Sequence, residues 1–205
     1  MKKSIIWKAS FLLFSCLALF LVIPPVTQAG EATNQVKETV DEVINILNIK
    51  ELKSPDKEKE RREKIRAVIE KRFDFAEMAK RALGKNWNRY PDQQSEFVTA
   101  FRQLLEETYA NQIEAANGDK VVYLNERTDK NYSEVDTKVI SPGGEETPMT
   151  YKLHSVNSDW KVYDIVVENI SIVNNYRAQF NRVLSNASLD ELIKRMKEKR
   201  FDKSS

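Results

Sequence analysis

The spacing of apolar residues changes from a helical repeat to a strand repeat at Gly118. Before it, Phe97, Phe101 and Leu105 recur every four positions, which is typical of the buried stripe of a helix. After it, apolar and polar residues alternate, which is typical of strands with one buried face. Helical spacing returns at Ile172. This order of helices, strands and helices predicts an α+β fold.

Before Gly118 the sequence predicts four helices, over residues 33–48, from Pro55, over 74–84 and from Pro91. Asp74 with Glu77 is a capping pair for the third helix. After the strands, Ile172 begins a fifth helix, and Ser188 with Glu191 is a capping box for a last one. The amino-terminal part of the fold is therefore expected to be helical.

Four alternating segments lie between these helical parts, and they contain Val122, Val135, Tyr151 and Ile165. Their links are short: one holds Pro142-Gly143-Gly144, and another holds Asn157-Ser158-Asp159, both of which are turn sequences. Strands joined by short turns pair with their neighbours in antiparallel fashion. We therefore expect an antiparallel sheet of about four strands.

The amino terminus has the three parts of a secretory signal peptide. Lys2 and Lys3 precede an apolar block over Ile5–Ile23, and small residues end at Ala29. Lys8 interrupts this block, and the part after it, Ala9–Ile23, is shorter than the roughly 20 residues that a membrane-spanning helix needs. We expect residues 1–29 to be cleaved and residues 30–205 to be exported; a retained anchor is the alternative.

Composition argues against several classes of protein. The 33 Lys and Arg residues nearly balance the 31 Asp and Glu residues, and no continuous Lys/Arg block occurs, so we expect no nucleic-acid binding. The one cysteine, Cys16, lies in the predicted leader, which leaves no thiol for a disulfide or a zinc site. We interpret the single histidine, His154, as a surface residue. No catalytic motif is present, so neither an enzyme nor a metal site is expected.

Asp164 is the one carboxylate that allows a different interpretation. Val162, Tyr163 and Ile165 surround it in sequence, and burial would raise its pKa towards that of a general base. Alternatively, it faces the wetter side of the sheet or accepts a hydrogen bond from a backbone amide. The sequence leaves these alternatives open.

Two blocks of sequence resemble the MlaC-type family of periplasmic phospholipid-binding proteins, also called toluene-tolerance proteins. The first comprises residues 72–84 with Trp87, residues 97–105 and Tyr109, and the second comprises residues 160–165, 168–171 and 175–180. The order and spacing fit from the signal peptide to about Leu184. Asn169 is a departure, because the family often has glycine there.

The resemblance implies an NTF2/cystatin-like fold, in which helices wrap a curved sheet around a lipid pocket. Residues 30–205 would form a single lipid-binding domain, helical over 30–118, a sheet over 119–170 and helical again over 171–200. It also implies a periplasmic carrier that takes phospholipid between an outer-membrane lipoprotein complex and an inner-membrane ABC transporter with an MCE-domain subunit. We expect a monomer that is not an enzyme, with phospholipid as cargo and no cofactor.

The candidate lipid-lining residues are apolar positions on both the helices and the sheet. They are Phe75, Met78, Leu83, Phe101, Leu105, Tyr109, Tyr151, Leu153, Ile165, Val167, Val173 and Tyr176. Because no Arg or Lys cluster forms an obvious phosphate clamp, we expect the headgroup to stay near solvent. Two other interpretations stay open: an envelope adaptor that holds no ligand, and an NTF2-like enzyme that uses Asp164.

Overall fold

A computed structural model of the chain describes residues 30–198, so the predicted signal peptide over residues 1–29 lies outside it. Within that range there are six α-helices, with short 3-10 turns between some of them. The helices are α1 (Glu31–Asn48), α2 (Glu58–Arg72), α3 (Phe75–Leu83), α4 (Gln94–Ala115), α5 (Ile172–Leu184) and α6 (Leu189–Lys197). No helix of this described part has both the length and the hydropathy to cross a bilayer.

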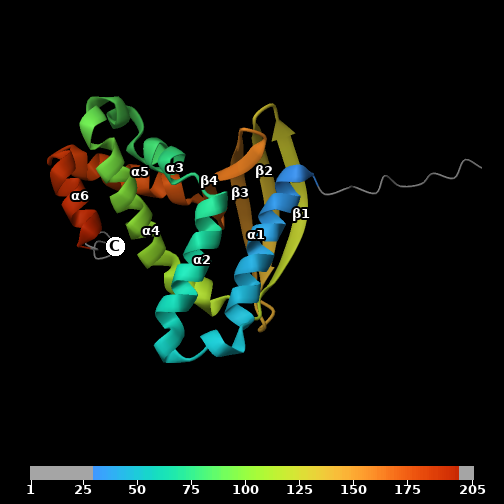
Figure 1. Ribbon diagram of the computed structural model, residues 1–205. Helices are drawn as coiled ribbons and strands as arrows, with labels where there is room; N and C mark the ends of the chain where they lie inside the picture. Colours follow the sequence, from blue (N-terminus) through green and yellow to red (C-terminus); the bar gives the residue numbers. More distant parts are fainter. Residues whose placement is uncertain (1–29, 199–205) are drawn as a thin grey trace, which may run out of the picture.

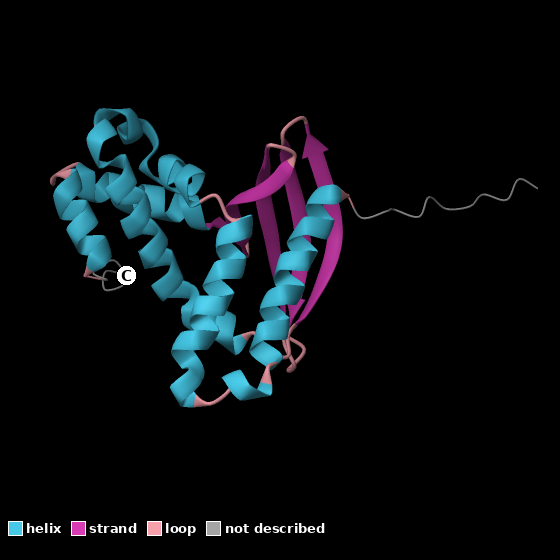
Figure 2. Cartoon of the chain, in the orientation of Figure 1, coloured by secondary structure: helices cyan, strands magenta, loops and turns pink. Residues whose placement is uncertain are grey.

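The sheet is antiparallel and its strands follow one another in chain order. They are β1 (Lys120–Asp129), β2 (Tyr132–Ile140), β3 (Glu146–Val156), β4 (Asp159–Val167) and the short β5 (Ile170–Ser171). Figure 1 shows a curved, unclosed sheet with α1 lying against it. Figure 2 shows α3 to α6 as a separate helical group beside the β4 side of the sheet. The predicted α+β class, with a helical amino-terminal part and a curved sheet, is confirmed.

Local signals in the sequence account for the turns and helix starts. Asp74 accepts a hydrogen bond from the Glu77 amide and Ser188 accepts one from the Glu191 amide, so both predicted caps are present. The turn between β4 and β5 holds Asn169 at a φ of 68°. Asparagine tolerates this left-handed region better than most residues do, so the turn does not require glycine at this position.

The apolar interior of the described residues is divided into three clusters. The bundle cluster joins α3, α4, α5 and α6 around Phe97, Phe101 and Phe180. The sheet cluster packs α1 on one face of the sheet, through Val36 and its neighbours. The third lies between α1, α2 and the turn that connects them, and it includes Ile65. Phe73, just after α2, packs against both the bundle cluster and the sheet cluster.

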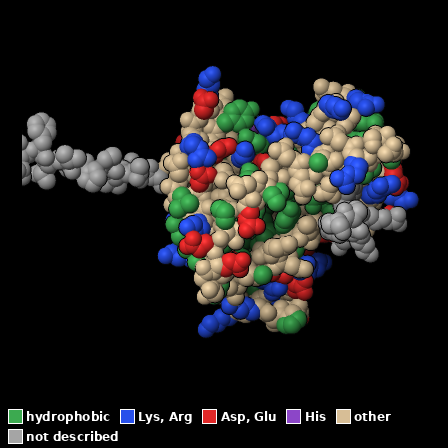
Figure 3. All heavy atoms as spheres, turned by 180° about the vertical axis from the view of Figure 1, so that it is seen from behind, with side chains coloured by type: hydrophobic (Ala, Val, Ile, Leu, Met, Phe, Trp, Pro, Cys, Tyr) green, Lys and Arg blue, Asp and Glu red, His purple; other side chains and the backbone are tan. Residues whose placement is uncertain are grey.

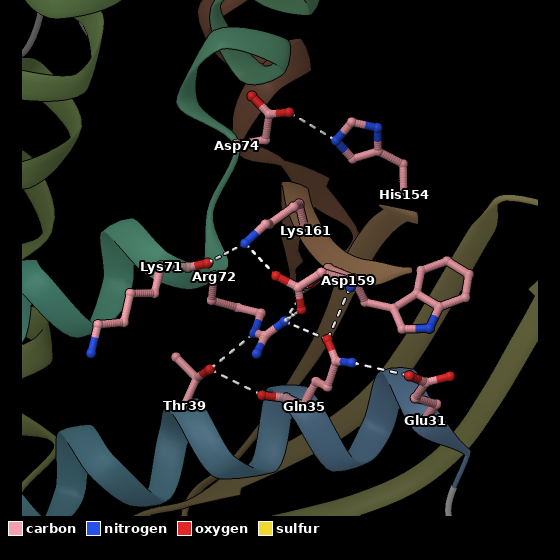
Figure 4. Close-up of polar contacts among 10 residues, drawn as sticks. Glu31, Gln35, Thr39, Lys71, Arg72, Asp74, His154, Asp159 and Lys161 are labelled. Carbon is pink, nitrogen blue, oxygen red and sulfur yellow. Dashed lines mark hydrogen bonds and ion pairs between the residues drawn. The ribbon is translucent and has the colours of Figure 1, made fainter. Parts of the chain in front are cut away.

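Arg72, the last residue of α2, holds α1, α2 and β4 together (Figure 4). Its Nε donates to Thr39 Oγ1 at 3.1 Å, and its Nη1 donates to the Trp160 carbonyl at 2.6 Å and to Asp159 at 3.0 Å. The same Nη1 donates to Gln35 Oε1, which also accepts from the Trp160 amide. Only 13% of the Arg72 side chain is exposed. We call this set of contacts the Arg72 joint.

Replacing Arg72 should therefore destabilise the whole fold. Arg72→Ala should lower the free energy of unfolding by about 3 kcal/mol, because it leaves several half-buried acceptors without a donor. Urea unfolding followed by circular dichroism measures this change. Lys37→Ala on α1 is the control: its ion pair with Asp41 is about half exposed, and its loss should cost less than about 1 kcal/mol. Equal effects of the two substitutions would contradict the role of the joint.

Candidate functional site between the sheet and the helices

The face of the sheet that carries Val135, Tyr151, Leu153 and Val162 is the inner face, and it is covered by α1. Alternation along the strands places these residues on one side, since Val135 pairs with Tyr151 and Leu153 pairs with Val162. The opposite face carries charged pairs, such as Arg127 with Glu134. An apolar ligand could therefore be enclosed only on the inner face.

Half-buried apolar side chains pack against each of the three clusters, and we call ten of them the apolar border. Each packs against one cluster and keeps part of its surface accessible. The set comprises Val40, Tyr123, Met149 and Ile165 beside the sheet cluster, Val43, Ile69 and Ile113 beside the α1–α2 cluster, and Phe75, Tyr109 and Ile172 beside the bundle cluster. Figure 3 shows hydrophobic side chains near the middle of one face, in a recess between the sheet half and the helical half.

Tyr123 on β1 adds a polar group to the apolar border. Its hydroxyl oxygen is buried and has no hydrogen-bond partner among the described residues. Burial, together with the nearby Tyr151 and Asp41, raises the pKa of Tyr123 well above its ordinary value. Burial also raises the pKa of Tyr151 to about 12. Both phenols are therefore neutral at physiological pH, and the Tyr123 hydroxyl is free to donate a hydrogen bond to a ligand.

The twelve predicted lining residues are distributed over more than one part of the interior. Eight belong to the bundle: Met78, Leu83, Phe101, Leu105, Val173 and Tyr176 are buried in its core, and Phe75 and Tyr109 are half-buried at its edge. Four belong to the sheet: Tyr151 and Leu153 are buried, and Ile165 and Val167 are half-buried. The structure thus brings Phe75, Tyr109 and Ile165 to the apolar border. Contact of any of the twelve with lipid stays a prediction.

The sequence interpretation missed several members of the apolar border, including Tyr123 and Met149. Tyr123 pairs with Thr137, which in turn pairs with Met149, so the three lie side by side across β1, β2 and β3. The alternation of apolar residues placed Met149 on a strand, but alternation alone does not reveal that an apolar side chain remains partly accessible. How much of the surface of Tyr123 and Met149 stays accessible depends on how far α1 covers the inner face of the sheet.

The Asp164 carboxylate has a structural role at the start of α5. Only 5% of Asp164 is exposed. One carboxylate oxygen accepts from Ser171 Oγ at 2.6 Å and the other accepts from the Val173 amide at 3.0 Å. This is the alternative in which the acid bonds a backbone amide. The contacts tie β4 to α5 and account for a buried carboxylate without any catalytic step.

The interpretation of His154 as a surface residue is wrong. Only 18% of its side chain is exposed, and its Nε2 lies 3.0 Å from Asp74 Oδ2 (Figure 4). Its ring also packs edge-on against Tyr163. Asp74 lies two residues after Arg72 and caps α3, so His154 is part of the connection between the sheet and α3. Among residues 30–198 no group of three His, Cys, Asp or Glu side chains is arranged to hold a metal ion.

These features define an α+β protein whose interior is divided and partly accessible along an apolar border. Residues 37–198 match the family described as MlaC protein, which is most of the chain. The chain belongs to the MlaC family, and the resemblance inferred from the two sequence blocks is confirmed.

A solved structure supports the same relationship. The phospholipid-binding protein from Ralstonia solanacearum, solved in complex with a phospholipid, is similar over 82% of this chain and 96% of its own, with 25% identity and a TM-score of 0.71. A search of curated proteins finds no match. The family and this neighbour point to a binding or transport protein rather than an enzyme.

The unpartnered hydroxyl gives a prediction for the ligand-free protein. Tyr123→Phe should raise the free energy of unfolding by about 1 kcal/mol, because it removes a buried polar group that has no partner. Thermal unfolding of protein stripped of bound lipid measures the change. Tyr132→Phe is the control, since Tyr132 is 50% exposed. A loss of stability in Tyr123→Phe would show that the hydroxyl has a partner inside the protein.

Proposed function

We propose that this protein carries phospholipid through the periplasm, between an outer-membrane lipoprotein complex and an inner-membrane ABC transporter with an MCE-domain subunit. The acyl chains lie along the apolar border, between the inner face of the sheet and the helices. The observation that carries the proposal is the divided interior, in which apolar side chains at the edges of three clusters remain partly accessible. Family membership and the phospholipid-bound neighbour support it.

The energetics of lipid transfer require a continuous apolar wall. Moving two acyl chains of about 16 carbons into water costs on the order of 25 kcal/mol, so a carrier has to cover nearly all of both chains. Strand residues such as Met149 and Ile165 and helix residues such as Tyr109 and Ile113 offer apolar surface on both sides. Because a bilayer is equally apolar, transfer between bilayer and carrier is close to balanced in free energy. Docking to the partner proteins then decides the direction.

The polar part of the lipid needs only weak recognition. The Tyr123 hydroxyl is the one buried side-chain donor that we assign to the ligand, and it would donate to an ester or phosphate oxygen near the glycerol. Tyr123→Phe should therefore weaken phospholipid binding while it stabilises the empty protein. The headgroup beyond the glycerol stays close to solvent.

Enlarging the strand residues of the apolar border should reduce the lipid load. Met149→Trp and Ile165→Trp should each lower bound phospholipid several-fold, because the added ring occupies space that the acyl chains need. Native mass spectrometry of detergent-free protein, followed by lipid extraction, measures the load. Leu124→Trp is the matched control, since Leu124 is a strand residue that is 57% exposed and should not change the load.

The same measurement on the unaltered chain tests the proposal itself. Protein expressed with its own leader and purified from the periplasm should begin at Gly30 and carry phospholipid. A folded, empty protein that also takes up no phospholipid from vesicles would overturn the carrier function and favour an adaptor that holds no ligand.

A further inference from the structure

Two acid-free segments of the chain together carry six basic residues. Residues 78–91 and 169–189 contain no Asp or Glu, although the chain as a whole has 31 of them against 33 Lys and Arg. The basic residues are Lys80, Arg81, Lys85, Arg89, Arg177 and Arg182. The first segment covers most of α3 and the turn after it, and the second covers α5.

The fold places these two segments side by side. Arg177 Nε on α5 donates to the Arg81 carbonyl at 2.7 Å. Asn86 Nδ2 donates to Asn181 Oδ1 at 3.1 Å, and Arg89 Nη1 donates to Asn86 Oδ1 at 3.2 Å. These bonds join α5 to the turn after α3 and make one continuous surface, which we call the basic surface. In Figure 3 Lys and Arg side chains are prominent over the upper part of the helical half.

The charge of the basic surface is largely uncompensated. Glu77 pairs with Lys80 and Arg81, but no carboxylate of the described residues lies within 4.0 Å of Lys85, Arg89, Arg177 or Arg182. Many basic side chains elsewhere in the described part have such partners, as Arg61 has in Glu114. Lys85, Arg89 and Arg182 are exposed. The field of this surface therefore attracts anions from solvent.

Aromatic residues lie among these basic residues. Trp87 and Tyr90 alternate with Lys85 and Arg89 in the turn after α3, pack against the bundle cluster and keep part of their surface accessible. The Arg89 guanidinium lies 5.7 Å from the centre of the Tyr90 ring. Trp and Tyr are enriched at the interface between lipid headgroups and acyl chains, so accessible rings among basic residues fit the surface of a bilayer.

We propose that the basic surface binds the anionic surface of a phospholipid membrane. Each Lys or Arg near such a surface contributes about 1 kcal/mol of attraction, so the exposed residues of this surface together suffice for reversible binding. The biological role of this binding rests on the proposed carrier function, because a carrier bound to the bilayer exchanges lipid without exposing the acyl chains to water. The attraction itself does not depend on whether lipid occupies the interior.

Co-sedimentation with vesicles tests the proposal. The full chain should sediment with phosphatidylcholine vesicles that contain phosphatidylglycerol, and not with pure phosphatidylcholine, and high salt should abolish the binding. The combined substitutions Lys85→Glu, Arg89→Glu and Arg182→Glu should weaken binding about 100-fold or more. The control carries the same charge change at exposed positions outside the basic surface, Lys50→Glu, Lys53→Glu and Lys120→Glu, and should bind nearly as the unaltered chain does.

The outcomes separate this proposal from the carrier function. Equal binding by the two triple variants would overturn the assignment of membrane binding to the basic surface. Failure of the unaltered chain to sediment more with phosphatidylglycerol vesicles than with pure phosphatidylcholine would overturn its attraction to an anionic membrane. In the second case the basic surface would belong to an acidic protein partner. Phospholipid content, measured on the same samples by mass spectrometry, should be normal in both triple variants. Empty protein that still sediments with anionic vesicles would contradict the carrier function alone.

Discussion

A single guanidinium at the end of α2 sets the position of α1, α2 and the sheet. A largely buried positive charge is tolerated only where hydrogen bonds and an opposite charge surround it. Arg72 finds these on α1 and at the start of β4, and the distances leave little freedom between the three elements. The next two residues continue the connection. Phe73 forms an isolated β-bridge with Val162 of β4, and Asp74 caps the start of α3. The position of the bundle beside β4 therefore also depends on the Arg72 joint.

The division of the interior follows from this arrangement. Polar contacts at the Arg72 joint hold the sheet and the helices together, and the apolar residues around them do not merge into one closely packed core. Protein interiors are normally packed without accessible gaps. The apolar border stays half-buried because the polar contacts of the Arg72 joint hold the sheet and the helices in position. The feature most useful for holding lipid thus depends on polar residues that need not touch the lipid.

Much of the fold could be predicted from the sequence, and less of the site. Periodicity located the helices and strands, and the caps at Asp74 and Ser188 are local signals that need no tertiary context. Phe101 and Leu83 are predicted lining residues that lie in the buried core of the bundle, and periodicity does not distinguish a residue that packs against other side chains from one that packs against a ligand. Tyr123 is not among the candidates because Val122 and Leu124 on either side of it carry the apolar alternation, whereas the sheet register places Tyr123 on the inner face. His154 was misjudged because its partner, Asp74, lies 80 residues away in the chain.

The residue pattern was sufficient to predict the order of the elements, the turns and the family. The elements and turns depend on neighbours within a few positions, and the family is recognised from continuous sequence motifs. Three features came from tertiary structure. They are the accessible apolar border, the unpartnered hydroxyl of Tyr123 and the basic surface made by α5 with the turn after α3. Each arises where segments far apart in the chain meet, and whether a side chain is then covered, paired or left accessible depends on distances that spacing along the sequence does not contain.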